Sequence, residues 1–207
     1  MNSYFDPGMN LLSCLLSILL TFQADVIGCQ SDIRAPFHQI VIREEDRQYV
    51  QFLWNDKVLR LQRVPFGLAC SPFMLLLHTV SCHLNQHPGV DPHIRRLIRR
   101  GIYMDDLCLS FSSPLEAETG MGRVRNISAA AGMDLHKERM SGAPSNNSSI
   151  LGIGWNTATD QLSVTIPRRD TLPDTKSGLL SLLSAPFDPL GVLTPWLIWG
   201  KVIFQDT

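Results

Sequence analysis

The sequence predicts an α+β fold, in which an antiparallel sheet carries helices on one face. Segments with strand and helix patterns are mixed along the chain in the order strand, hairpin, helix, hairpin, helix, strands, which favours this layered class. Turn residues stand between paired strand patterns at NDK, residues 55–57, and at the acidic pair 105–106. The chain has 207 residues, of which 44% are hydrophobic, so it can bury a sizeable core.

The first predicted element is an apolar helix over residues 11–22, LLSCLLSILLTF. A bilayer-spanning helix needs roughly 20 residues, which this run does not reach. A signal peptide has basic residues before its apolar run, but the first basic residue of this chain is Arg34. We therefore predict a buried amphipathic helix, with a secretory signal as the alternative. The chain is expected to be intracellular, in the cytoplasm or nucleus, and not to enter a membrane.

A strand and a hairpin follow this helix. Residues 25–33, DVIGCQSDI, predict a buried strand, and residues 48–54 and 58–64 predict the two arms of a hairpin that turns at NDK. Ser71 is followed by proline, which is typical of an N-cap and first helical position. An apolar run continues from there to Leu84, so a helix is expected over this segment.

The second half of the chain continues the same alternation. Residues 91–100 predict a short basic helix that leads into a hairpin over 101–111, turning at its two aspartates. Residues 114–132 predict a helix that ends near Gly132. The remaining expectations are a loop at 142–149, strands at 133–140, 150–156 and 161–167, and helical pieces after Asp170 that are broken by Pro186, Pro189 and Pro195.

Composition excludes several classes of protein. The net charge of −1 gives no overall basic field, so nucleic-acid binding would need a local patch. Arg95, Arg96, Arg99 and Arg100 form such a candidate on the basic helix, although a solvated helix face is favoured. Five scattered cysteines without a CxxC pair argue against a disulfide framework and a zinc site. The six histidines lack metal-ligand spacing and are interpreted as structural or surface residues.

The segment GIYMDDLCLSF, residues 101–111, carries the strongest chemical feature. Asp105 and Asp106 are adjacent carboxylates in an apolar run, and burying both charges destabilises each of them. A divalent cation removes this penalty because it becomes the largest local charge. Magnesium takes one or two protein carboxylates plus phosphates, so a further acid is expected from a neighbouring strand, and Asp32 is the candidate. Taken alone, the pair also fits a solvated hairpin turn.

Five segments in order resemble the motifs of reverse transcriptases. They are SDIRAPFHQI at 31–40, VPFGLACSPF at 64–73, YMDD at 103–106, AAGMDLHKERMS at 130–141 and LGIGWN at 151–156. Together with FDPLGVLTP at 187–195, they are similar to the BEL/Pao class of long-terminal-repeat retrotransposons. The resemblance implies a right-hand polymerase palm with a ferredoxin-like (RRM-like) βαββαβ sheet. It divides the chain into a palm with partial fingers over 1–168 and the start of a thumb or connection region over 169–207.

The resemblance also implies roles for individual residues. Asp32, Asp105 and Asp106 match the catalytic, metal-binding acids, the backbone carbonyl of Ile33 is a further metal ligand, and Lys137 matches a proposed general acid. The implied substrate-binding residues are Phe37 as the gate against a ribose 2′-hydroxyl, Phe66 and Gly67 near the nucleotide and template, Tyr103 and Met104 near the primer end, and Gly152 and Trp155 in the primer grip. Taken alone, Phe37 fits a core position and Lys137 a surface charge.

The activity implied is RNA-directed DNA polymerisation with two Mg²⁺ ions, for which Mn²⁺ is the alternative. One ion activates the primer 3′-hydroxyl and the other neutralises the leaving diphosphate. The implied partners are an RNA or DNA template with its primer, and a dNTP.

Two departures from the family predict a weak enzyme. Only 31 residues precede Asp32 and none is basic, whereas the family's fingers carry a Lys and an Arg that clamp the triphosphate. Pro36 stands where a backbone N–H receives the triphosphate, and proline has none. We expect the metal site to persist and polymerisation to be impaired, with upstream fingers and downstream ribonuclease H or integrase segments belonging to a parent polyprotein. The alternatives are a non-catalytic nucleic-acid-binding module and a decayed or domesticated remnant.

Overall fold

The computed structural model describes residues 2–76, 83–86, 89–144, 147–167 and 174–206. The chain forms two compact units, Met1–Glu138 and Arg139–Thr207. The first unit is built on a four-stranded sheet of order β4-β5-β1-β6, in which every register that is defined is antiparallel. Its helices and strands are α1 (Leu15–Phe22), β1 (Ile27–Ile33), β2 (Gln51–Trp54), β3 (Lys57–Arg60), α2 (Ser71–Leu76), α3 (Pro92–Gly101), β4 (Ile102–Tyr103), β5 (Asp106–Phe111), α4 (Pro114–Ala130) and β6 (Leu135–Met140).

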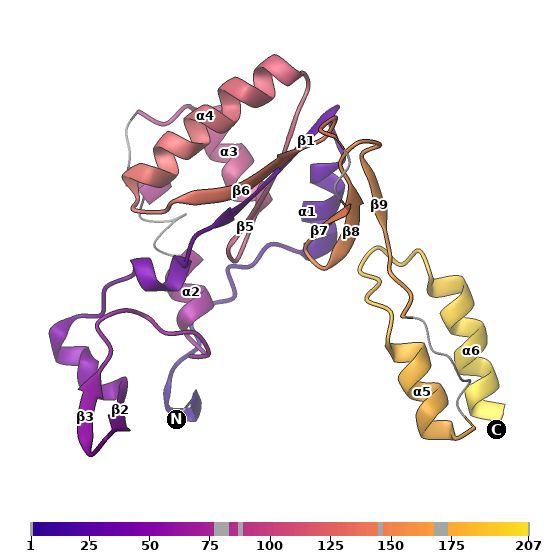
Figure 1. The fold of residues 1–207 in the computed structure, drawn as a ribbon, viewed down its shortest axis with the longest axis horizontal. Helices are drawn as coiled ribbons and strands as arrows, with labels where there is room; N and C mark the ends of the chain where they lie inside the picture. The colour runs from indigo at the N-terminus through magenta and orange to yellow at the C-terminus, as the bar shows by residue number, and fades with distance from the viewer. Residues whose placement is uncertain (1, 77–82, 87–88, 145–146, 168–173, 207) are drawn as a thin grey trace. The chain divides into compact units, whose positions relative to one another are not determined.

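Helices α3 and α4 lie together against the sheet (Figure 1). Both begin with a side-chain cap followed by proline: Asp91 accepts a hydrogen bond from the backbone N–H of His93, and Ser113 accepts one from Glu116. Their apolar residues then turn toward the strands, where Ile98 of α3 is buried. The sheet is thereby backed by two helices whose starting points are set by the local sequence.

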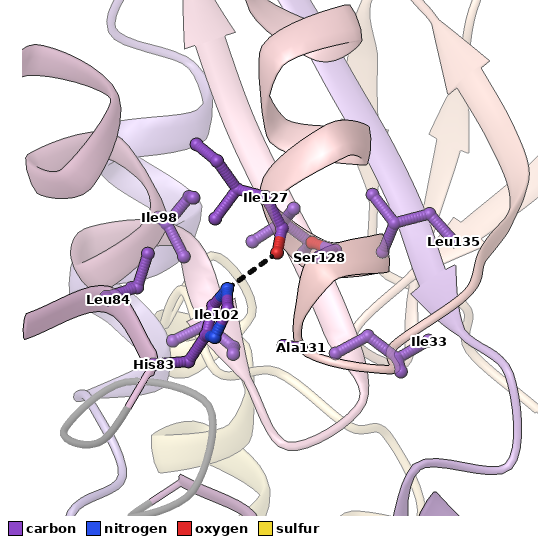
Figure 2. Close-up of a pocket in the computed structure, with 10 residues that line it drawn as sticks. Ile33, His83, Leu84, Ile98, Ile102, Ile127, Ser128, Ala131 and Leu135 are labelled. Atoms are coloured by element: carbon purple, nitrogen blue, oxygen red, sulfur yellow. Dashed lines mark hydrogen bonds between the residues drawn. The ribbon is translucent and has the colours of Figure 1, made fainter. Parts of the chain in front are cut away.

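A small apolar cavity marks the interface between these helices and the sheet (Figure 2). It has a volume of about 20 Å³, which is room for about one water molecule. His83 reaches into it and its Nε2 lies 2.9 Å from the backbone carbonyl oxygen of Ile127, a contact in which the imidazole N–H donates. Ile33, at the end of β1, lines the same cavity. The cavity is part of the packed core that supports β1 and is too small for a substrate.

The β2–β3 hairpin turns at Asn55 and Asp56, as predicted. Both residues have positive φ, 48° and 58°, which is the geometry of a two-residue type I′ turn. Asparagine and aspartate tolerate this region better than other residues with a side chain, so the turn follows directly from the sequence.

The second unit contains a three-stranded antiparallel sheet and two helices. Its elements are β7 (Asn147–Ile150), β8 (Ile153–Asn156), β9 (Gln161–Ser163), α5 (Lys176–Ser184) and α6 (Thr194–Asp206). The single strand predicted over 150–156 is wrong, because Leu151 and Gly152 form a turn with φ of 49° and 85°. A side chain at Gly152 would also clash with the ring of Phe187, at 2.9 Å from an added Cβ. Pro195 stands in the first turn of α6, where proline is tolerated.

The mixed α+β architecture with antiparallel sheets and helices is confirmed. The helix predicted over 11–22 begins only at Leu15, and strand β7 starts inside the segment 142–149 that was predicted to be a loop. The helix predicted to run to Leu84 is described only as far as Leu76, since residues 77–82 lie outside the described ranges. Among the described residues, no helix has the length and apolarity to span a membrane. The palm and thumb boundary at residue 168 stays a prediction.

Candidate active site

The register of β1 and β5 brings the predicted acids to one end of the central sheet. Asp32 is paired with Asp106 across the two strands, so their side chains emerge on the same face. One residue further along, the backbone N–H of Ile33 donates to the carbonyl oxygen of Asp105 at 2.7 Å. Positions 74 and 72 residues apart in the sequence are therefore held together by the pairing of the two strands.

The hairpin between β4 and β5 presents Asp105 at its tip. Tyr103 pairs with Asp106, and the two residues between them form the turn, with Met104 at φ of 55°. Methionine is rarely found with positive φ, and this backbone conformation is costly for a residue with a Cβ. Asp105 is exposed, while Tyr103, Met104 and Asp106 are half-buried. The turn thus projects one acid into solvent and keeps the other against the strand.

The carboxylates of this site crowd one another. Burial, a hydrogen bond with Asp32, and the negative charges of Asp105 and Asp32 together raise the pKa of Asp106 from 3.8 to about 6. The side-chain amide of Gln30, 3.4 Å from Asp106 Oδ1, acts in the opposite direction and lowers that pKa. The protein alone therefore leaves an excess of negative charge here, which is the condition under which a bound cation is favourable.

Strand β6 contributes two contacts to Asp32. The Nζ of Lys137 lies 3.0 Å from Asp32 Oδ2, and the Nδ1 of His136 lies 3.2 Å from the backbone oxygen of Asp32. Ser31 donates from its hydroxyl to the carbonyl oxygen of His136 at 3.3 Å. These bonds tie the ends of β1 and β6 together beside the acids.

The donor set fits a magnesium ion. Among the described residues, no group of three or more His, Cys, Asp or Glu side chains is gathered closely enough to hold a metal in this conformation. Magnesium needs only one or two protein carboxylates when substrate phosphates supply further oxygens. The paired carboxyls of Asp32 and Asp106 supply that number of protein ligands, and the ammonium group of Lys137 already places a positive charge at Asp32.

The predicted gate residue Phe37 lies in a short 3-10 helix, Pro36–Gln39, directly after β1. It is buried, with 6% of its surface exposed, and it packs edge-on against Phe66 at a ring-centroid distance of 4.8 Å. Phe66 itself is 60% exposed and also meets His38 edge-on. Phe37 therefore serves as a core residue in the protein alone, and its role as a gate stays a prediction.

The predicted glycine and primer-grip residues have structural reasons of their own. Gly67 has φ of 86°, a conformation that favours glycine, and an added Cβ would meet open space. We expected Gly67 to allow a nucleotide to approach the backbone closely, and this stays a prediction. Trp155 is buried and its Nε1 donates to Asp160 Oδ1 at 2.8 Å. Gly152 and Trp155 thus shape the second sheet, and a role in gripping a primer stays a prediction.

The four arginines of α3 do not form a uniform surface. Arg96, Arg99 and Arg100 are exposed, whereas Arg95 is half-buried. Arg99 bonds to Asn85, so it is not a free phosphate contact in this conformation. The preference for a solvated helix face agrees with the exposure of three of the four.

Two residues of the site were missed by sequence reasoning. Gln30 stands two positions before Asp32, and the alternation of a strand places both on the face that carries Asp106. His136 was interpreted as structural or surface, although its position beside Lys137 put it in the same strand. The strand register was the information that could have found both.

Comparison with known proteins agrees with this arrangement. The family model of reverse transcriptase (RNA-dependent DNA polymerase) matches residues 3–155. The foamy viral protease–reverse transcriptase in complex with an RNA/DNA hybrid is similar in structure, with a TM-score of 0.60 and 19% identity over 93% of this chain and 26% of that chain. The same viral protein in complex with double-stranded DNA gives a TM-score of 0.56 and 21% identity over 80% of this chain and 34% of that one.

At such identities the structural likeness establishes the fold. The chain spans about a quarter to a third of the length of these viral proteins. No curated protein sequence matches it. The family model covers well over half of the residues, including both strands that carry the three acids, and the fold is that of the palm. The chain belongs to the reverse transcriptase family.

Proposed function

We propose that this chain is the catalytic palm of an RNA-directed DNA polymerase that joins a dNTP to a primer 3′-hydroxyl. The single observation that carries the proposal is the register of β1 and β5, which sets Asp32 opposite Asp106 and the turn residue Asp105 beside Ile33. The foamy viral relatives were solved with an RNA/DNA hybrid and with double-stranded DNA, which supports a primer–template duplex as the partner of this chain.

The three acids and the carbonyl of Ile33 are the proposed ligands of two Mg²⁺ ions, with Mn²⁺ as the alternative. When bound, such a pair activates the attacking hydroxyl and neutralises the leaving diphosphate. The chain's own residues prepare for this by concentrating negative charge, because Asp32 and Asp106 share one face and Asp105 extends beyond them. Lys137, whose Nζ lies 3.0 Å from Asp32 Oδ2, is the proposed general acid for the diphosphate.

The remaining predicted residues receive the nucleotide and the primer in this proposal. Phe37, supported from the side by Phe66, excludes a ribose 2′-hydroxyl once the sugar is placed over β1. The other proposed contacts are Gly67 with the template, Tyr103 and Met104 with the primer end, and Gly152 and Trp155 in the primer grip.

We further propose that the chain is a weak polymerase on its own. Pro36 begins the 3-10 helix under the gate and offers no N–H to a triphosphate. A lost hydrogen bond to a charged group costs about 1.5–3 kcal/mol, or roughly ten- to a hundredfold in dNTP affinity. Pro36→Ala restores the N–H, so its KM for dNTP should fall while kcat changes less.

Primer extension on an RNA template tests the proposal. Slow, Mg²⁺-dependent extension by the wild type that is abolished in Asp105→Asn supports it. Extension that is unaffected by Asp105→Asn contradicts the assignment of the acids, and fast wild-type synthesis contradicts only the impairment. Asp56→Asn, in the β2–β3 turn away from the acids, is the matched control for a lost carboxylate.

The finer assignment, to a BEL/Pao element, rests on the FDPLGVLTP segment at 187–195 together with the motif set. An intracellular location stays a prediction. The second candidate function is nucleic-acid binding without turnover, for which the exposed Arg96 and Arg100 of α3 are the candidate phosphate contacts. Salt-dependent binding that survives Asp105→Asn but is lost in Arg96→Gln/Arg100→Gln would identify that function.

A further inference from the structure

Lys137 reaches the acidic site from a neighbouring strand. Its Nζ lies 3.0 Å from Asp32 Oδ2, and among the ion pairs of the described residues this is the one that involves any of the three acids. The lysine side chain is 60% exposed, whereas that of Asp32 is 23% exposed. The ammonium group therefore comes in from the solvent side and covers an acid that is itself mostly buried.

The backbone around Lys137 directs the side chain to this position. Lys137 has φ of 52° in the middle of β6, which is a strained conformation for a residue with a Cβ. Its neighbours are held on both sides: His136 bonds to β1, and Glu138 accepts two hydrogen bonds from the guanidinium of Arg125, at 2.9 and 2.7 Å. With both neighbours anchored, the strained residue between them points at Asp32.

Charge explains what the ammonium does there. Asp32 and Asp106 share one face at this end of the sheet, and the charges of Asp32 and Asp105 destabilise the ionised form of Asp106. Lys137 supplies one positive charge to Asp32, which lies in β1, the strand between β5 and β6. A divalent cation bound at the carboxylate of Asp32 would be repelled by an ammonium group that remained beside it.

We propose that Lys137 is a displaceable internal cation, which occupies the cation position at Asp32 when the metal is absent and is released by the metal. This inference rests on the proposed function, because it assumes that the acids bind divalent ions. Metal binding then frees the ammonium of Lys137 from Asp32. The exposed stem allows the freed group to move toward the phosphates of a substrate without rearrangement of the strand.

Mn²⁺ binding to the purified 207-residue chain, followed by electron paramagnetic resonance of the free ion, provides the test. Lys137→Met removes the charge and keeps the stem, so the Kd for Mn²⁺ is expected to fall by about two- to tenfold, the range for a partly exposed pair. Lys137→Arg keeps the cation and should leave Kd within about twofold. Arg125→Gln, which breaks the ion pair of the adjacent residue Glu138, is the matched control and should not change Kd.

The outcomes separate this inference from the proposed function. If wild type and Lys137→Met bind Mn²⁺ equally, or the variant binds it more weakly, Lys137 does not compete with the metal and the inference is overturned while the metal site stands. If neither chain binds Mn²⁺ up to millimolar concentration, the inference is overturned, and primer extension, in which substrate phosphates are present, decides the proposed function separately.

A second measurement uses the wild-type chain and does not depend on a variant that folds. In a chain with ¹³C-labelled lysine, the ε-methylene NMR signal of Lys137 should move toward the position of a solvated lysine as Mg²⁺ is added. The same signal should already lie at that position in Asp32→Asn without metal. A Lys137 signal that stays unchanged at saturating Mg²⁺ contradicts the displacement.

Discussion

The β2–β3 and β4–β5 hairpins have the same kind of turn but differ in how far their strands are buried. Each consists of two antiparallel strands joined by a two-residue turn. All eight strand residues of β2 and β3 are exposed, including Leu53 and Trp54, whereas β5 is buried from Leu107 to Phe111. The turn residues differ as well, since Asn55 and Asp56 suit positive φ and Met104 does not. Two of the predicted acids lie on the hairpin whose strand β5 is buried and whose turn has a positive φ at Met104, so packing against the sheet positions them.

The largest difference between the hairpins should appear in core substitutions. Leu109 is 1% exposed in β5 and Leu53 is 68% exposed in β2. Leu109→Ala leaves a cavity and is expected to lower the free energy of unfolding by about 2–5 kcal/mol. Leu53→Ala, the same chemical change, should stay within about 0.5 kcal/mol. Urea unfolding of both variants measures this, and equal losses would mean that the β2–β3 hairpin is covered in solution.

The pH dependence of stability gives a second, smaller difference. The pKa of Asp106 is raised to about 6 in the folded chain, whereas its ordinary value, 3.8, applies to the unfolded chain. Between pH 3.8 and about 6 the folded state therefore binds more protons than the unfolded state. The free energy of unfolding should therefore increase as the pH falls from about 7 to 5. After allowance for solvent screening of this half-buried group, the gain is about 1 kcal/mol.

Asp106→Asn should abolish that pH dependence, and urea unfolding at several pH values checks it. These unfolding measurements should stay above pH 4.5, because Glu116 also contributes to the pH dependence below it. Hydrogen bonds from Ser112 lower the pKa of Glu116 from its ordinary value of 4.5. The stabilisation from Glu116 is present above this pH and lost below it. A stability that rises with pH between 5 and 7 would contradict the crowding of the acids.

Sequence patterns predicted local structure well and packing poorly. The turn at Asn55 and Asp56 was predicted from residue preferences within a few positions; the caps at Asp91 and Ser113 follow from the same kind of preference, although they were not predicted. The acids were predicted from the charge cost of Asp105 and Asp106 and from the resemblance, while the pairing of Asp32 with Asp106 depends on the register between β1 and β5, which no local pattern states. Gln30 and His136 were missed for that reason. The prediction of a single strand over 150–156 was wrong because an apolar run does not reveal that Gly152 adopts positive φ.

The smallest predicted difference concerns the two turns. Met104→Gly removes the penalty of positive φ at the tip of the β4–β5 hairpin, but it adds backbone freedom to the unfolded chain. The net change should be a stabilisation of at most about 1 kcal/mol. Aspartate already tolerates the φ of 58° at position 56, so Asp56→Gly should change the free energy of unfolding by close to zero.

Thermal unfolding of Met104→Gly and Asp56→Gly, measured side by side, decides whether strain is stored in the turn that carries Asp105. A higher melting temperature for Met104→Gly together with reduced primer extension would mean that the strained turn is kept for function at the expense of stability. Glycine would then loosen the turn that joins Asp105 to β4, while the bond from the backbone N–H of Ile33 to Asp105 remains. If Met104→Gly is destabilised as much as an ordinary glycine substitution, the methionine side chain stabilises the turn through its contacts, and positive φ at this position carries no stored strain.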